Sequence, residues 1–84
     1  MDSKGDFLDI VKELKELLED SAVPKNVREK IETVIKTLEE DGDESLKVNK
    51  ALNDLDEVAD DVNMQPYTRT QIWNIVSMLE KISS

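Results

Sequence analysis

Residues 24–62 read PKNVREKIETVIKTLEEDGDESLKVNKALNDLDEVADDV and hold two apolar stripes on either side of one acidic turn. In each half the apolar side chains recur at steps of three and four residues, which places them on one face of an α-helix. Gly42 is typical of a residue that follows a helix, and Asp43 or Glu44 suits the start of the next one. Because the connection is short, we expect the two helices to lie antiparallel. The stripes are Val27, Ile31, Val34, Ile35 and Leu38, and then Val48, Ala51, Leu52, Leu55, Val58, Ala59 and Val62.

A similar stripe lies on each side of this stretch. The upstream stripe has Asp6 as a plausible N-cap and stops near Asp20, because Pro24 disfavours a helix at the preceding residue and itself fits a first helical turn. Downstream, Thr68 with Gln71 resembles a capping box, although Pro66 could open that helix earlier. The two outer stripes are Phe7, Ile10, Val11, Leu14, Leu17 and Leu18, and Ile72, Ile75, Val76, Leu79 and Ile82.

Four stripes joined by short turns predict an all-α, up-down-up-down four-helix bundle. We expect a single domain over residues 1–84, with helices at residues 6–20, 24–40, 44–62 and 67–82. No run with the period of a β-strand interrupts these segments. The predicted core is Leu14, Leu17, Ile31, Leu38, Leu52, Leu55, Ile75 and Leu79.

Composition excludes several classes of function. The net charge is −9, so we expect no nucleic-acid partner and no binding to anionic membrane surfaces. The longest uncharged run, TQIWNIVSML at residues 70–79, is half the roughly 20 residues that a membrane span needs. The opening residues MDSKGDFLDI lack the apolar core of a signal peptide, so we expect a cytoplasmic protein. There is no Cys and no His, which removes the usual metal ligands and general base.

Two acidic patterns invite a metal interpretation. The turn EEDGDES does not match a calcium-binding EF-hand loop, because the sixth and twelfth residues from Asp41 are Leu46 and Leu52 rather than Gly and Glu. The second pattern pairs E-x-x-E with E-x-x-D, as small all-helical nucleotide pyrophosphatases do when they bind magnesium. Its residues lie off the apolar stripes, so we interpret them as solvated and expect no metal, cofactor or catalytic site. They are Glu29 and Glu32, and Glu57 and Asp60.

The final segment differs from the rest of the chain. Residues 1–61 carry 19 Asp/Glu against 9 Lys/Arg, whereas residues 62–84 carry only Glu80 against Arg69 and Lys81. The single Trp, Trp73, lies roughly 120° from the centre of its apolar stripe and shares a face with Arg69. Three interpretations stay open for Trp73: burial against the first helix beside Leu8, an interface with a protein partner or a second copy, and stacking on a nucleic-acid base. We further hypothesise that Arg69 stacks on the indole and hydrogen-bonds to a carboxylate.

The stretch NMQPYTRTQIWNIVSMLE, together with VPKNVREKIE and LDEV, resembles an uncharacterised family of short acidic archaeal proteins. The resemblance implies a four-helix, bromodomain-like bundle of unknown function, and it implies no activity. One departure stands out, because the family pattern has Pro directly after the Met and then a His, whereas this chain has Gln65, Pro66 and Tyr67. A family chemistry that used that His would be lost here.

Together these observations favour a non-enzymatic protein that binds a protein partner, or itself, through the last helix. The candidate interaction surface is Pro66, Tyr67, Arg69 and Trp73. The alternative is a magnesium-dependent nucleotide pyrophosphohydrolase that uses the carboxylates described above.

Overall fold

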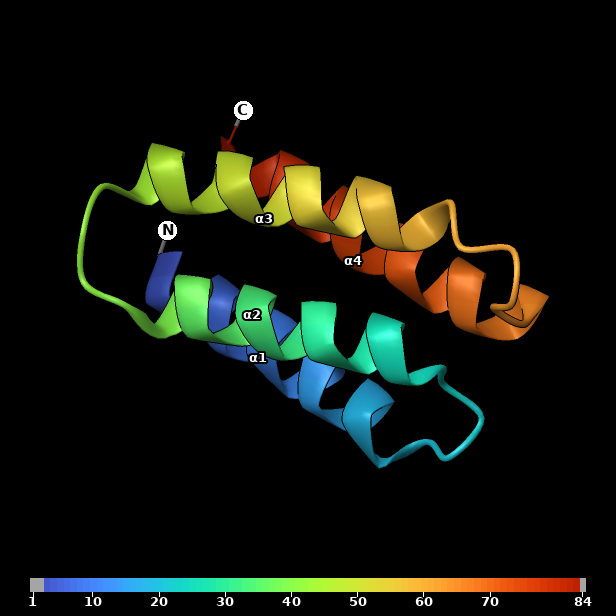
Figure 1. Ribbon diagram of the computed structural model, residues 1–84. Coiled ribbons are helices and arrows are strands. Elements are labelled where there is room, and N and C mark those ends of the chain that lie inside the picture. Colours follow the sequence, from blue (N-terminus) through green and yellow to red (C-terminus); the bar gives the residue numbers. More distant parts are fainter. Residues whose placement is uncertain (1–2, 84) are drawn as a thin grey trace.

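The acidic turn around Gly42 reverses the chain between two helices, and the same reversal occurs twice more. The computed structural model describes residues 3–83, and Figure 1 shows their arrangement. The described chain consists of helices and turns, with no strand within residues 3–83, which confirms the predicted all-α class. The helices are α1 (Ser3–Glu19), α2 (Lys25–Glu39), α3 (Glu44–Ala59) and α4 (Pro66–Ser83).

The four helices form two antiparallel hairpins, α1–α2 and α3–α4, laid against each other (Figure 1). Within the described chain each helix packs against two neighbours, in the order α1–α2–α3–α4–α1, and neither diagonal pair meets. This is the up-down-up-down bundle that short connections favour. The α1–α2 and α3–α4 connections lie at one end of the bundle, called the loop end below, and the α2–α3 turn lies at the other (Figure 1).

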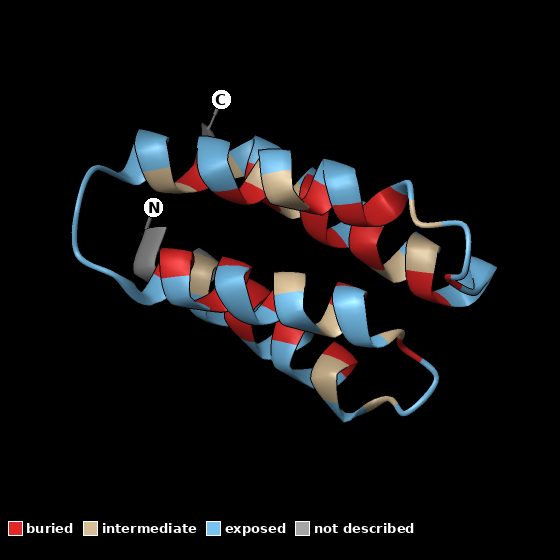
Figure 2. Cartoon of the chain, viewed as in Figure 1, coloured by how far each residue is buried: buried red, intermediate tan, exposed pale blue. Residues whose placement is uncertain are grey.

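The apolar stripes face inward, and Figure 2 shows the buried residues gathered along the inner sides of the helices. Seven of the eight predicted core residues are buried. Leu52 is the exception, because it lies at the edge of the α3 stripe and is only half-buried against the core. Sequence reasoning missed Val23 and Met64, which are buried in the two connections at the loop end.

Several helix ends differ from the prediction. The first helix begins at Ser3, so Asp6 lies within it and is not its N-cap. Pro24 precedes the first residue of α2 rather than lying inside it. At α3 the expected start is confirmed: the helix begins at Glu44, and the Asp43 side chain before it accepts a hydrogen bond from the Leu46 N–H at 3.2 Å. The fourth helix begins at Pro66, so Thr68 does not cap it and is buried in its first turn.

The end of α3 also differs, because the helix stops at Ala59 rather than at residue 62. The chain then turns, with the Asp61 N–H donating to the Val58 carbonyl at 3.0 Å and the Met64 N–H donating to the Asp61 carbonyl at 3.3 Å. As a result Met64 is buried, whereas Val62 is 89% exposed. Val62 continued the apolar period, but the turn directs its side chain to solvent.

Candidate functional site

The outward side of α4 carries an uncharged surface. All seven exposed residues from Gln65 to Ser77 lack charge, in a protein where 37% of residues are charged. Trp73 is 45% exposed and Tyr67 is 68% exposed. We call this surface the α4 face; it consists of Gln65, Pro66, Tyr67, Thr70, Trp73, Asn74 and Ser77.

Arg69, which the sequence placed in the same surface, is half-buried and points elsewhere. Its Nε donates to the Ala59 carbonyl at 3.1 Å, and its Nη2 donates to the Asp61 carbonyl at 2.9 Å. Ala59 is the last residue of α3, where helical carbonyls lose their partners and a cation is favourable, and Asp61 lies in the turn that follows. The hypothesis that Arg69 hydrogen-bonds to a carboxylate is therefore wrong, because its acceptors are backbone carbonyl oxygens. Arg69 instead ties the start of α4 to the end of α3.

The position of Arg69 also identifies the flank of α4 on which Trp73 lies. Residues four apart share a helix face, and Arg69 reaches α3, so Trp73 lies on the side of α4 that faces α3. Leu8 is 69% exposed and lies over the α1–α2 groove, which Lys15 and Glu39 also line and where they pair at 3.6 Å. The interpretation in which Leu8 and α1 cover Trp73 is therefore wrong, because Leu8 lies on the opposite flank of α1.

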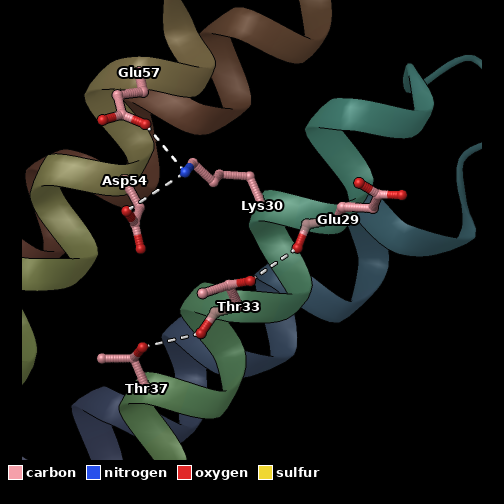
Figure 3. Close-up of polar contacts among 6 residues, drawn as sticks. All are labelled: Glu29, Lys30, Thr33, Thr37, Asp54 and Glu57. Atoms are coloured by element: carbon pink, nitrogen blue, oxygen red, sulfur yellow. Dashed lines mark hydrogen bonds and ion pairs between the residues drawn. The ribbon is translucent and has the colours of Figure 1, made fainter.

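Two of the four carboxylates proposed for magnesium line a shallow groove between α2 and α3. The groove has a volume of about 480 Å³, and Glu29 and Glu57 both line it, whereas Glu32 and Asp60 do not. Figure 3 shows the Glu29 carboxylate directed away from Glu57. Among the residues that the structure describes, no group of three or more acidic side chains is placed to hold a metal ion.

Lys30 occupies the position between the α3 carboxylates (Figure 3). Its ammonium lies 3.1 Å from Glu57 Oε2 and 3.9 Å from Asp54 Oδ1. The hydrogen bond to Glu57 and its charge, with a smaller contribution from Asp54, raise the pKa of Lys30 above its usual value. A bound cation would have to displace this ammonium. The groove is therefore a helix–helix contact with a charge pair across it.

Asp61 joins three segments at the loop end, and sequence reasoning missed it. One carboxylate oxygen accepts a hydrogen bond from the Asn26 side chain at the start of α2, and the other accepts from the Asn63 N–H at 2.8 Å. These two donors, and then the Arg69 charge, hold the pKa of Asp61 below its usual value. The available signal was Asp61 two residues before Asn63, the spacing of an Asx-turn that ends a helix.

Comparison with known proteins places the chain among archaeal relatives. A family model described as "Uncharacterised protein family (UPF0147)" matches residues 1–82. A UPF0147 protein of Methanocaldococcus jannaschii is 40% identical over 70 residues, which cover 82% of this chain and 75% of the relative. A UPF0147 protein of Archaeoglobus fulgidus is 32% identical over 81 residues, which cover 96% and 93%.

The fold also has a solved counterpart. The crystal structure of MMP1188, titled a protein of unknown function, superposes with a TM-score of 0.87 at 36% identity. The match covers 94% of this chain and 91% of that one, so it includes all four helices. None of these names assigns an activity. Within the described residues, none of the helices combines the length and the apolar character that crossing a membrane requires.

Proposed function

The chain belongs to the UPF0147 family, and on that premise we propose that it is a non-catalytic binding module that acts through a protein contact on the α4 face. The observation that carries the proposal is the half-exposed Trp73 at the middle of an uncharged helix face. The cores of protein interfaces are depleted of charged residues and enriched in aromatic ones, and Trp is prominent among the residues that dominate binding energy.

The construction of the fold supports this role for Trp73. The core residues Ile72, Ile75 and Leu79 hold the buried side of α4, and Arg69 fixes its start to α3. The outward side chains are therefore presented on a rigid helix, which lowers the entropy lost when a partner binds. Pro66 and Tyr67 extend the surface at the loop end. The cytoplasm is the setting that we propose for this contact.

The test is a pull-down from an extract of the source organism. Three immobilised baits are compared: wild type, Trp73→Ala and Leu8→Ala. Leu8 is the matched control, because it is also an exposed large apolar residue but lies on the α1–α2 side. We expect one retained protein, identified by mass spectrometry, to be lost with Trp73→Ala and kept with Leu8→Ala. Equal retention by all three baits would contradict a contact on the α4 face.

A further inference from the structure

The two connections at the loop end have the same hydrogen-bonded backbone. Asp20 lies in the turn after α1, and Asp61, which follows it by 41 positions, lies in the turn after α3. Each aspartate side chain accepts a hydrogen bond from the N–H two residues later, at 2.9 and 2.8 Å. Each aspartate carbonyl accepts a bond from the N–H three residues later, at 3.2 and 3.3 Å. The donors of that second bond are Val23 and Met64, and both are buried.

An arginine in the helix that follows closes each turn in the same way. The Arg28 Nη2 donates to the Asp20 carbonyl at 3.3 Å. The Arg69 Nη2 donates to the Asp61 carbonyl at 2.9 Å, and the two arginines are again 41 positions apart. The Arg69 Nε makes a further bond, whereas the buried Arg28 Nε has no hydrogen-bond partner among the described residues. The second turn is therefore a more fully bonded version of the first.

The offset of 41 also relates the buried positions of the two hairpins. Each residue from 7 to 41 can be paired with the residue 41 positions later, from 48 to 82. Eleven residues are buried in each of these segments, and nine of the positions coincide. No buried residue is paired with an exposed one. The agreement runs through both helices and the turn between them, so it is not confined to the loop end.

We infer that the bundle is one helical hairpin used twice in a single chain, and that the α4 face is where the second copy departs from the first. The first copy comprises α1 and α2, and the second comprises α3 and α4. A rotation that carries α1 to α3 and α2 to α4 exchanges the diagonal pairs without reversing their direction, so its axis runs along the bundle (Figure 1). The α2–α3 and α4–α1 contacts are then counterparts of each other.

The first hairpin therefore serves as an internal reference for the second. On the outward side of α2, three positions carry charged residues whose counterparts on the α4 face are uncharged, and all six residues are exposed. The bundle thus accepts charged side chains at these positions. The lack of charge on the α4 face is a change in the second copy rather than a requirement of the fold. The pairs are Glu29 and Thr70, Glu32 and Trp73, and Lys36 and Ser77.

The repeat also predicts a contact that the wild-type chain lacks. At the α2–α3 contact, the Lys30 ammonium lies 3.1 Å from the Glu57 carboxylate. The counterpart of Lys30 is Gln71, whose buried side-chain oxygen has no hydrogen-bond partner within the described residues. The counterpart of Glu57 is Glu16 on α1, the helix that packs against α4. A lysine at position 71 should therefore reach the Glu16 carboxylate.

A double-mutant cycle tests this contact by thermal melting at low salt. We expect Gln71→Lys to raise the melting temperature by about 4 °C, as a modest ion pair does in a domain of this size, and Glu16→Gln to remove the gain. Gln65→Lys is the control, because it adds the same charge at an exposed position of α4. A gain of equal size in both Lys variants, or one that Glu16→Gln leaves unchanged, would overturn the equivalence of the two contacts.

A second experiment transfers the whole turn from one hairpin to the other. Residues 61–69 are replaced by a copy of residues 20–28, which keeps Asp and Arg in place. The control inserts residues 21–29 instead, which removes the Asp and displaces the Arg by one position. We expect the in-register chimera to unfold cooperatively within about 8 °C of wild type and the shifted one to melt lower or fail to fold. Equal behaviour of the two chimeras would overturn the repeat.

A third measurement tests whether the fold requires the uncharged face. The double variant Thr70→Glu, Ser77→Lys gives α4 the charges that α2 carries at the counterpart positions. We expect it to melt within about 4 °C of wild type, and a loss of more than about 8 °C would show that the uncharged face serves the fold. The turn and ion-pair experiments involve no partner, so the repeat can fail while the contact proposed for the α4 face stands.

Discussion

Arg69 is the residue whose role depends most on its surroundings. It is the single charge between Met64 and Leu79, yet its guanidinium is half-buried against two carbonyls at the end of α3. A guanidinium can serve both acceptors because its donors lie in a planar fork, which an ammonium cannot reproduce. Trp73, four residues later, keeps 45% of its surface exposed. Arg69 thus stabilises the fold, whereas Trp73 on the same helix face remains half-exposed at the surface.

We predict that Arg69→Ala lowers the free energy of unfolding by about 2 kcal/mol, because hydrogen bonds from a charged group each contribute about 1.5–3 kcal/mol and this position is only partly buried. Arg69→Lys should recover less than half of the loss. Urea unfolding at neutral pH measures both. The control is Lys36→Ala at an exposed position of α2, which should change stability by less than 0.5 kcal/mol or so. Equal effects at the two sites would contradict a capping role for Arg69.

Asp61 predicts a specific dependence of stability on pH. The Asn26 and Asn63 donors hold its folded-state pKa below the unfolded value of about 3.9. The stabilisation is therefore fully present above the unfolded pKa and is lost as the pH falls through the folded pKa. We expect Asp61→Asn to destabilise the protein above about pH 5 and the difference from wild type to shrink below about pH 4. Chemical unfolding measures the free energy of unfolding across this pH range, and Asp56→Asn is the control at an exposed position. A difference between Asp61→Asn and wild type that does not vary with pH would contradict this role of Asp61.

At the scale of the elements, the α2–α3 turn decides how the two hairpins meet. Gly42 has φ = +147°, a backbone conformation that side chains with a Cβ rarely adopt, and nothing lies within 4 Å of the place that a Cβ would take. The requirement for glycine here is therefore one of backbone conformation rather than of space. The following Asp43 then caps α3.

We predict that Gly42→Ala lowers the free energy of unfolding by about 1–3 kcal/mol, the usual cost of holding a residue in such a conformation. For a domain of this size each kcal/mol corresponds to about 4–8 °C in melting temperature. The melting temperature of Gly42→Ala is compared with that of Asp41→Ala, a control at the neighbouring exposed position. A variant that melts like wild type would show that the turn relaxes at no cost.

At the scale of the whole molecule, the four helices pack in a closed ring of neighbours, and several polar contacts lie at the α2–α3 side. Lys30 bridges to Glu57 and Asp54 there, and Asn26 bonds to Asp61 nearby. Exposed ion pairs contribute little to stability, typically below about 1 kcal/mol. Apolar burial therefore holds the bundle together, and the polar contacts fix the alignment of α2 along α3.

The occupied groove predicts the response to magnesium. A specific ion at a hundredfold excess over its Kd adds about 2.7 kcal/mol to the free energy of unfolding. Because Lys30 already lies against Glu57, we expect millimolar magnesium to leave the melting temperature equal to that in sodium chloride of matched ionic strength. A magnesium-specific rise that disappears in Glu29→Gln would instead support the carboxylate site.

The sequence by itself determined the number of helices, their antiparallel order and most of the core, because apolar side chains at helical spacing must turn toward one another to leave water. It also determined that α4 carries an unusual uncharged segment. The end of α3 had a local signal in Asp61 and Asn63, but tertiary structure decided that Met64 is buried after the turn while Val62, which continues the apolar period, is exposed. It likewise decided that Arg69 turns onto α3 and that Trp73 stays half-exposed. Those outcomes depend on which helix lies beside each flank, and the period of one helix carries no information about its neighbours.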